Sequence, residues 1–313
     1  MIAEQPTIGI CGAGQIGAAA AVAFSRAGYR VLLWLRSTAK MTATEGTLSN
    51  LEVWMNDNVG QPTSRDGSVE VIDSLNRIDR ECQLVMEAIA ENLAQKVELF
   101  SRLGDARRRG SIFLTTTSGL SITELGRESL VGTRLVGTHF WNPPHLMPLV
   151  EVVRGADTLE ETVISVVEIV RSIGKIPVIV NHDVPGFVGN RLLHALWREA
   201  ISLVELGIAS PADVDLVARL TFGLRLAAIG PLENMDVVGL DLIETIHEYL
   251  LADLCDAEKP QRALVGRVAN GQLGVKSGAG FYDWTTRSAH DLIERRDRQI
   301  VNQLAFLRQM GTI

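Results

Sequence analysis

Short apolar runs separated by amphipathic segments fill the first half of the chain. Residues 7–11 and 29–35 form two such runs, each close to polar turns. Further runs at 83–88 and 111–115 lie on either side of a helical pattern over 92–109. Buried parallel strands have continuously apolar sequences, and alternating strands and helices form a parallel sheet covered on both faces. The pattern therefore predicts a doubly wound, mostly parallel α/β domain.

Helical periodicity replaces this alternation in the second half of the chain. Apolar residues recur at helical spacing over 187–206 and 290–310. A proline suits the first turn of a new helix, and Pro185 follows a polar turn in this way. The sequence therefore predicts an α/β domain at 1–183 and an all-α domain at 184–313.

The first apolar run ends in a glycine-rich turn that leads into an alanine-rich segment. In a strand–turn–helix unit, the first glycine forms the turn and the second admits a pyrophosphate close to the backbone. The third glycine packs the helix on the strand, and the N–H groups at the helix start bind the pyrophosphate. We expect a Rossmann-type domain that binds a dinucleotide through Gly12, Ala13, Gly14, Gln15, Ile16 and Gly17. A plain glycine-rich loop is the alternative.

The residues after the second apolar run bear on which dinucleotide binds. NAD-specific sites usually have Asp or Glu at the end of the second strand, where it binds the ribose hydroxyls. Leu35 occupies that position here, and Arg36, Ser37 and Lys40 follow it. A guanidinium and an ammonium in place of a carboxylate favour the additional phosphate of NADP. NADP is accordingly predicted over NAD, the alternative being a solvated loop in which Arg36 only stacks on adenine.

A histidine and a glutamate in two later apolar segments are candidates for acid–base chemistry. His139 follows residues 134–137, and Glu151 lies in the next apolar run. A carboxylate that binds one ring nitrogen fixes the tautomer and leaves the other nitrogen as a proton acceptor. Glu91 and Ser118 also follow apolar runs, so we expect them at the same edge of the sheet. A lone histidine on a strand is more often a core residue, and the dinucleotide motif favours chemistry here.

Composition excludes several other classes of protein. Of the 313 residues, 46% are hydrophobic and 21% are charged, as in a globular protein. The net charge of −7 and the lack of a basic stripe argue against nucleic-acid binding. No apolar stretch approaches the ~20 residues of a membrane span, and the start leaves no room for a signal peptide. Cys11, Cys82 and Cys255 have neither metal-ligand spacing nor an even count for disulfides. We expect a cytoplasmic protein without a metal and without a membrane or nucleic-acid partner.

Several motifs together resemble the 3-hydroxyacyl-CoA dehydrogenase family. They are the glycine-rich turn, Glu91-Asn92-Leu93, Thr117-Ser118, the segment from His139 to Pro144, Glu151, Asp183–Leu192 and Gly274–Tyr282. The resemblance covers nearly the whole chain and implies His139 as catalytic base or acid with Glu151 as its orienting partner. It further implies substrate contacts from Ser118 and Asn190. The cofactor contacts that it implies come from Glu91, Lys96, Ser118, Asn142 and Lys276.

Two departures from the family pattern bear on the cofactor and the substrate. The first is Leu35, already described. The second is that residues 47–58 contain no lysine or arginine, whereas acyl-CoA enzymes have lysines there for the CoA phosphates. Asn142-Pro143-Pro144 and Ile229-Gly230-Pro231-Leu232 are more similar to relatives that act on free acids, among them the gulonate, carnitine and pyridine-carboxylate dehydrogenases. A small carboxylate is therefore expected as the substrate.

The sequence thus predicts an NAD(P)-dependent oxidoreductase that interconverts a β-hydroxy acid, or a similar secondary alcohol, and its keto form. Two alternatives keep the same site: NAD-linked oxidation of an aldehyde such as a formyl-pyridine carboxylate, and a true 3-hydroxyacyl-CoA dehydrogenase. A dinucleotide-binding structural protein of the crystallin type is the non-enzymatic alternative. Binding alone needs no base, so the set of Ser118, His139, Glu151 and Asn190 argues against it. The all-α domain is expected to form a homodimer.

Overall fold

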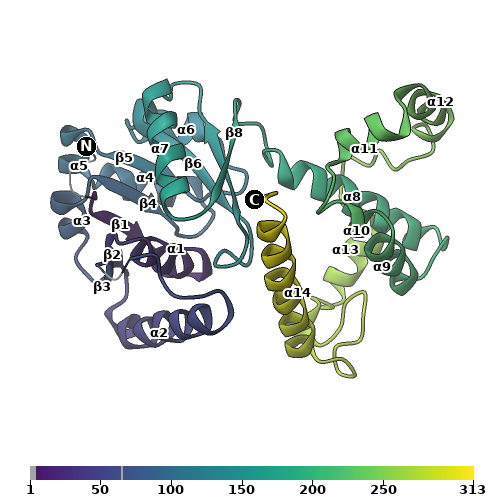
Figure 1. Ribbon diagram of the computed structural model, residues 1–313, viewed down its shortest axis with the longest axis horizontal. Helices are drawn as coiled ribbons and strands as arrows, with labels where there is room; N and C mark the ends of the chain where they lie inside the picture. The colour runs from purple at the N-terminus through teal and green to yellow at the C-terminus, as the bar shows by residue number, and fades with distance from the viewer. Residues whose placement is uncertain (1–4, 65) are drawn as a thin grey trace. The chain divides into compact units, whose positions relative to one another are not determined.

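Eight strands form one mixed sheet in the first part of the chain (Figure 1). The computed structural model describes residues 5–64 and 66–313. The strands are β1 (Ile8–Cys11), β2 (Arg30–Trp34), β3 (Ser68–Ile72), β4 (Leu84–Glu87), β5 (Ile112–Thr115), β6 (Leu135–Phe140), β7 (Leu149–Arg154) and β8 (Ile176–Val180). Their order is β3-β2-β1-β4-β5-β6-β7-β8, and neighbouring strands are parallel except for the antiparallel pair β6–β7. The predicted α/β fold with a doubly wound, mostly parallel sheet is confirmed.

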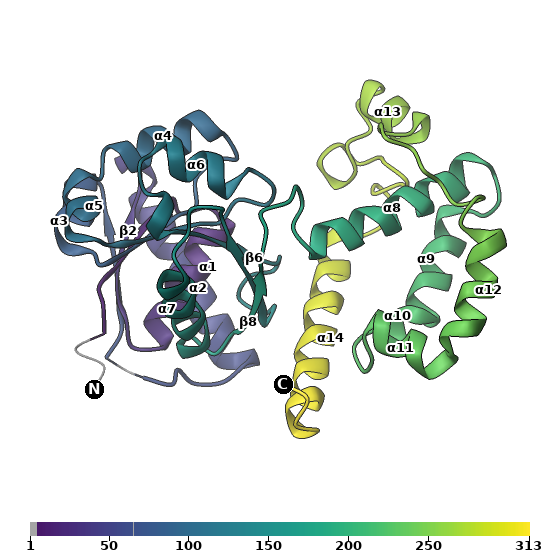
Figure 2. The ribbon, with the colours of Figure 1, turned by 90° about the horizontal axis from the view of Figure 1, so that it is seen from above.

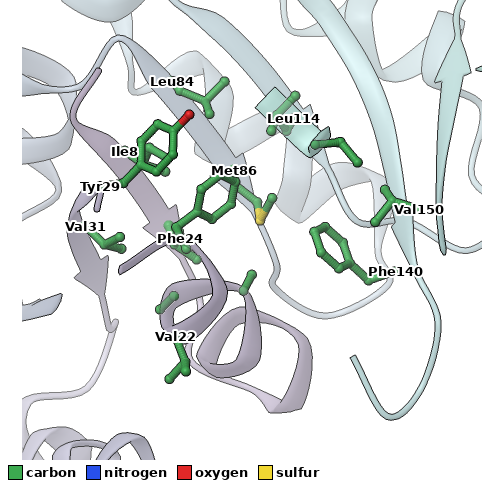
Figure 3. Close-up of a cluster of buried hydrophobic side chains, with 14 of the residues drawn as sticks. Ile8, Val22, Phe24, Tyr29, Val31, Leu84, Met86, Leu114, Phe140 and Val150 are labelled. Carbon is green, nitrogen blue, oxygen red and sulfur yellow. The ribbon is translucent and has the colours of Figure 1, made fainter. Parts of the chain in front are cut away.

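Helices cover both faces of this sheet. They are α1 (Gln15–Arg26), η1 (Thr38–Lys40), α2 (Met41–Asn58), α3 (Leu75–Glu81), α4 (Leu93–Ser101), α5 (Gly104–Arg109), α6 (Ile122–Glu128), η2 (Gly132–Arg134) and α7 (Glu160–Ser172). Successive side chains of a strand point to opposite faces, so the strands contribute to two apolar clusters. α1, α2 and α7 pack on the cluster that contains Phe24, Met86 and Phe140 (Figure 3). α3 to α6 pack on the cluster that contains Phe100 and Phe113.

Residues 191–295 form a second compact unit, which is all-helical (Figure 2). Its helical segments are α8 (Gly189–Glu205), α9 (Pro211–Leu220), α10 (Phe222–Arg225), α11 (Pro231–Val238), α12 (Leu240–Leu250), α13 (Arg262–Ala269), η3 (Val275–Ser277) and the first residues of α14 (Ala289–Gln309). The predicted all-α second part is confirmed. Residues 296–313 belong to the same compact unit as residues 1–190. The domain boundary predicted between residues 183 and 184 stays a prediction.

Three of the differences from the predicted elements have a clear physical reason. β3 was not predicted, because its alternating, partly exposed residues at the edge of the sheet lack a continuous apolar run. The single helix predicted over 92–109 is two helices, since the buried Leu103 interrupts the helical backbone with a ψ of 55° before Gly104. β6 extends to Phe140, so that His139 lies within the strand and not after it.

Neither a membrane-spanning helix nor a metal-binding cluster occurs among the described residues. None of the helices in residues 5–64 and 66–313 is long and apolar enough to span a membrane. Within the same residues, no group of three or more His, Cys, Asp or Glu side chains is arranged to hold a metal ion.

Candidate active site

His139 and Glu151 face each other across the antiparallel strands β6 and β7. They are direct partners in the strand register, and Nδ1 of His139 lies 2.6 Å from Oε2 of Glu151. Both side chains are buried, with 6% and 2% of their surface exposed. Gly137 is the register partner of Thr115, the last residue of β5, so His139 lies two residues beyond the carboxyl end of that strand. The antiparallel return of β7 thus places a buried carboxylate on the imidazole at the edge of the parallel sheet.

A tight turn before α8 supplies two further hydrogen bonds to Glu151. The backbone N–H groups of Val188 and Gly189 both donate to Oε1 of Glu151, each over 3.0 Å. Burial raises the pKa of Glu151, but the hydrogen bonds from His139 and from these two N–H groups outweigh it and hold the pKa below its usual value. Glu151 is therefore an ionised acceptor that binds one imidazole nitrogen and two amides at once.

Aromatic side chains enclose the imidazole of His139. The rings of Trp141 and Phe187 stand edge-on to it, with centroid distances of 5.1 and 5.7 Å. Phe187 has a positive φ of 50°, which is uncommon for a residue with a side chain. A Cβ atom at Gly189 would lie 2.1 Å from the indole ring of Trp141, so only glycine allows this close approach. The turn therefore fixes both the aromatic wall and the donors to Glu151.

Ser118 lies on a loop that Glu91 and Asn190 hold in place. Oγ1 of Thr117 and the N–H of Ser118 donate to Oε1 of Glu91 over 2.5 and 2.9 Å. Nδ2 of Asn190 donates to the carbonyl oxygen of Ser118 over 3.2 Å. Burial raises the pKa of Glu91, whereas these bonds and the charge of Lys96 lower it below its usual value overall. Ser118 itself is exposed, so its hydroxyl is accessible to a ligand.

Lys96 forms a buried ion pair with a glutamate at the end of β4. Its ammonium donates to both carboxylate oxygens of Glu87 over 2.7 and 2.8 Å and lies 3.3 Å from Oε2 of Glu91. Glu87 also accepts from Oγ1 of Thr115 and from the N–H of Ile89. The side chains of Lys96 and Glu87 are 1% and 0% exposed. Lys96 thus positions Glu91 from inside the protein, and its predicted contact with the cofactor stays a prediction.

The glycine-rich turn has the backbone that the dinucleotide motif requires. Gly12 has a φ of 111°, and a Cβ atom there would lie 2.5 Å from the carbonyl oxygen of Ala88. At Gly17 a Cβ atom would lie 1.9 Å from the carbonyl oxygen of Gly12. Around Gly14 no atom lies within 4 Å of the corresponding position, so the backbone at the start of α1 is open to a ligand. Nε2 of Gln15 donates to Oδ1 of Asn142 over 2.8 Å, which ties this turn to the segment after β6.

A cavity of about 370 Å³ adjoins the turn on the side of β2. Gly12, Ala13 and Gly14 line one end of it. The cationic side chains that line it are those of Arg36, Lys40 and Arg102, and Glu98 is the acidic one. Leu35 is buried at the position where an NAD-specific site usually has a carboxylate. The cavity is open to an anionic group beyond the second strand.

The first compact unit brings most of the predicted site residues together. One chain of contacts joins His139, Glu151 and the turn at 188–189, and another joins Lys96, Glu91, Ser118 and Asn190. Gln15 and Asn142 are in mutual contact, and Arg36, Ser37 and Lys40 line the cavity with the glycine-rich turn. Lys276 belongs to the second unit, in η3, and its role stays a prediction.

Several residues of the site were not predicted from the sequence. They are Glu87, Thr117, Phe187, Gly189 and Arg102. A signal existed for Glu87, which ends an apolar run as Leu35 and Thr115 do. Thr117, Phe187 and Gly189 lie in motifs that carry the family resemblance, but their contacts depend on how loops fold back on the sheet, and Arg102 had no comparable signal.

Comparison with known proteins places this chain in a class of NAD-binding dehydrogenases. Residues 7–184 match the model of the 3-hydroxyacyl-CoA dehydrogenase NAD binding domain, and residues 186–284 match that of the C-terminal domain. The chain belongs to the 3-hydroxyacyl-CoA dehydrogenase family. It is an NAD-binding oxidoreductase of the kind that acts on a CH–OH group or an aldehyde.

Two curated relatives and one solved structure illustrate the range of similarity. The chain is 32% identical over 295 residues to 5-formyl-3-hydroxy-2-methylpyridine 4-carboxylate 5-dehydrogenase of Mesorhizobium japonicum, covering 94% of this chain and 96% of the relative. It is 36% identical over 295 residues to a probable 3-hydroxybutyryl-CoA dehydrogenase of Bacillus subtilis, covering 91% and 100%. A crystal structure of a 5-formyl-3-hydroxy-2-methylpyridine 4-carboxylic acid 5-dehydrogenase, described as an NAD+ dependent dismutase, superposes with a TM-score of 0.91 at 32% identity. That superposition covers 97% of this chain and 98% of the other.

Proposed function

We propose that this protein interconverts a β-hydroxy acid, or a similar secondary alcohol on a small carboxylate, and its keto form, with His139 as the general acid and base. The observation that carries the proposal is the buried 2.6 Å contact between His139 and Glu151. A histidine with a purely structural role does not need an ionised partner that two backbone amides hold in place. An imidazole that gains and loses a proton needs such a partner, because the carboxylate stabilises the imidazolium and keeps the ring in one orientation.

The proton moves through the outer nitrogen of His139. Nδ1 donates to Glu151, so in the neutral ring Nε2 has the lone pair that accepts the hydroxyl proton of the substrate. The C–H bond of the same carbon breaks as a hydride leaves, and a carbonyl group forms. In the reverse direction the imidazolium returns the proton to the oxygen. Acid–base assistance of this kind typically contributes about 10²–10⁴-fold to the rate.

The glycine-rich turn and the start of α1 are suited to the pyrophosphate of a dinucleotide. Gly14 leaves the backbone open, and the unpaired N–H groups of a helix start bind anions. When bound, the nicotinamide supplies the hydride acceptor. Gln15 and Asn142 connect this turn to the strand of His139, and Ser118 is exposed on the neighbouring loop, where its hydroxyl is available to the substrate oxygen.

The choice between NADP and NAD depends on the cavity beyond β2. Arg36 and Lys40 line it, Ser37 contributes a hydroxyl, and Leu35 provides no acceptor for ribose hydroxyls. These features support NADP, whereas the pyridine-carboxylate relative is described as NAD+ dependent. The preference for NADP therefore stays a prediction, and the ratio of kcat/KM for NADPH to that for NADH decides it.

The absence of cations on α2 supports a free acid as the substrate. This helix, Met41–Asn58, contains Glu45, Glu52 and Asp57 but no lysine or arginine. A CoA nucleotide carries several phosphate charges, which proteins usually bind with such cations. A thioester of CoA is the less favoured substrate for this reason.

Oxidation of an aldehyde is the second candidate. It is favoured by the superposition on the formyl-pyridine carboxylate dehydrogenase over almost the whole of both chains. His139 would act on the hydrated aldehyde as it acts on an alcohol: one hydroxyl gives up its proton to Nε2, the carbon loses a hydride, and a carboxylic acid results. The same residues thus serve both reactions, and the substrate decides between them.

A substrate panel tests the proposal. The purified protein is assayed by nicotinamide absorbance, with NADH and NADPH or their oxidised forms in parallel, on acetoacetate, a formyl-pyridine carboxylate and acetoacetyl-CoA. Turnover of a free acid that His139→Gln abolishes supports the proposal. Strong preference for the CoA thioester contradicts the argument from α2, and the absence of turnover with every compound contradicts the enzymatic function.

A homodimer is proposed from the second unit. None of the described residues 191–295 is buried, and large apolar side chains such as Trp197, Leu220 and Tyr249 are about half exposed or more. Many exposed large apolar side chains in one unit favour an association surface there. Sedimentation equilibrium at micromolar concentration is expected to give twice the monomer mass of 34.1 kDa, and a monomer would contradict the proposal.

A further inference from the structure

A second cavity in the first compact unit is separate from the glycine-rich turn. Its volume is about 530 Å³, within the range of small-molecule sites. The ends of α1, α2 and α7, the loop before β7 and the C-terminal part of α14 enclose it. Helix α1 starts at the dinucleotide motif and reaches this cavity with its last turn, at Arg26. Twelve residues of helix separate the two places by about 18 Å.

Lys175 is a buried cation in this cavity. It lies between α7 and β8, is 8% exposed, and donates from Nζ to the carbonyl oxygen of Met147 over 2.8 Å. Burial and, to a lesser extent, the charge of Arg308 together lower the pKa of Lys175 to about 8. A carbonyl oxygen satisfies one of three N–H bonds of the ammonium and none of its charge.

The other cationic side chains of the cavity bring no carboxylate close to Lys175. Arg171 and Arg308 both line it and are exposed. Within residues 5–64 and 66–313, neither they nor Lys175 form an ion pair with a carboxylate. Arg26 also lines the cavity, but its guanidinium is already bound to Glu52. The residues that line the cavity include no aspartate or glutamate.

Asp297, whose charge acts on His145, is itself paired with Arg296, so within the described residues no carboxylate forms an ion pair with Lys175. A buried ammonium that is repelled by a neighbouring guanidinium costs free energy unless an anion balances it. Buried cations in proteins are usually paired for this reason. An anion between Lys175 and Arg308 would turn the repulsion into two charge-assisted hydrogen bonds.

We propose that this cavity is a binding site for a small organic oxyanion, a carboxylate or a phosphate with an apolar body. Lys175 binds the charged head, and Arg308 and Arg171 close over it from the solvent side. Leu146, Ile173 and Leu304 line the same cavity and are suited to the apolar body. His145 lines it as well, with its ring edge-on to Trp54 at a centroid distance of 5.0 Å. Burial lowers the pKa of His145, so a neutral ring contributes no further charge.

The test is a binding titration with three probes, followed by calorimetry. Benzoate and phenyl phosphate distinguish the carboxylate from the phosphate head, and inorganic phosphate shows whether the apolar body is required. Saturating NADH is present throughout, so that the dinucleotide motif does not bind the probe. Lys175→Met removes the ammonium and keeps the length of the side chain. The control is Lys259→Met, an exposed lysine of the second unit.

The wild type and Lys259→Met are expected to bind benzoate or phenyl phosphate with the same Kd, and Lys175→Met at least about 10-fold more weakly. Binding that survives Lys175→Met unchanged belongs to another site, such as the substrate site beside His139, and overturns the proposal. The proposal is also overturned if none of the three probes binds the wild type at 10 mM, because a Kd of about 10 mM is the weakest that a useful site would have. If Lys175→Met does not fold, the Kd of the probes is compared between the wild type and Arg308→Met, because Arg308 is exposed.

Discussion

Two buried carboxylates of the sheet, Glu87 and Glu151, have different partner side chains. Glu87, at the end of β4, accepts hydrogen bonds from Lys96, Thr115 and the N–H of Ile89. Glu151, on β7, accepts from His139 and from two backbone amides. Both side chains are at most 2% exposed. In burial and in the number of donors the two sites are alike.

The difference lies in the partner side chain. Lys96 directs its ammonium at Glu87 and Glu91, so this pair is a closed ionic contact that supports the loops around it. His139 uses one nitrogen for Glu151, and within the described residues no hydrogen bond engages its Nε2. Under the proposed function, His139 can therefore exchange a proton through its second nitrogen, whereas the ammonium of Lys96 is engaged by its carboxylate partners. The predictions below test this division of roles.

His139→Gln is expected to have the largest effect on turnover. Glutamine can still contact Glu151 but cannot exchange a proton, so kcat falls by about 10²–10⁴-fold. The Kd of the cofactor, measured by fluorescence titration, stays within about 2-fold. The matched control is His290→Gln, whose side chain is 86% exposed and which is expected to leave kcat unchanged. A variant with near-normal turnover removes His139 from the mechanism.

Lys96→Met is expected to have the largest effect on stability. It leaves the carboxylate of Glu87 buried without a cation, which costs about 3–5 kcal/mol in the free energy of unfolding. Urea unfolding measures this loss. The double variant Glu87→Met, Lys96→Met removes both charges and is expected to be more stable than the single variant. If Lys96→Met loses less than about 1 kcal/mol, the contact is not the closed ion pair described here.

Glu151→Gln is expected to lower turnover less than His139→Gln does. The imidazole remains but loses its ionised partner, and by analogy with carboxylates that orient metal-bound histidines the loss is expected to be at least about 10–100-fold. The fall is in kcat, with the KM for the cofactor little changed. Equal losses in Glu151→Gln and His139→Gln would show that the histidine contributes nothing without its carboxylate, and an unchanged kcat would show that the carboxylate has no role.

Glu151→Gln is also expected to change how the free energy of unfolding depends on pH. The pKa of Glu151 is lower in the folded protein than its ordinary value of 4.5. A lowered pKa stabilises the folded state above the ordinary value, and the stabilisation is lost as the pH falls through the lowered one. The difference in unfolding free energy between wild type and Glu151→Gln is therefore expected to shrink as the pH falls below 4.5. A difference that does not shrink below pH 4.5 contradicts the assignment.

Arg36→Ala is expected to have the smallest effect and to act only on the cofactor. Loss of a charge-assisted contact with the additional phosphate raises the KM for NADPH about 10-fold and leaves that for NADH within about 2-fold. Arg108→Ala is the control, because Arg108 is exposed on α5 and pairs only locally with Asp105. Equal changes for both cofactors would show that Arg36 stacks on adenine, as the alternative interpretation of this loop has it.

The fold was predictable to the extent that its strands have continuously apolar sequences. β1, β2, β4 and β5 are buried on both faces and were predicted to within one or two residues at each end. β3 pairs with β2 at the edge of the sheet and exposes Ser68 and Glu70, so its sequence resembles a loop. Its place depends on tertiary contacts, and a local pattern does not contain them.

The site was predictable as a set of residues but not as a set of contacts. His139 and Glu151 could be paired from their spacing across two strands, and the glycine-rich turn from its motif. The amides of Val188 and Gly189 reach Glu151 across 37 and 38 residues of sequence through a turn with an unusual φ at Phe187. Such contacts follow from the path of the loop, which propensities do not specify.

The central claim is that Glu151 holds neutral His139 with its proton on Nδ1 and its lone pair on Nε2. Two-bond ¹H–¹⁵N correlation spectra of protein labelled at its six histidines measure this directly, and His139→Gln assigns the signal. At a pH where the ring is neutral, we expect Nδ1 to have the shift of a protonated nitrogen and Nε2 that of an unprotonated one, with the preference lost in Glu151→Gln. A proton on Nε2 in the wild type would contradict the account, because the nitrogen that faces the substrate could then not act as the base.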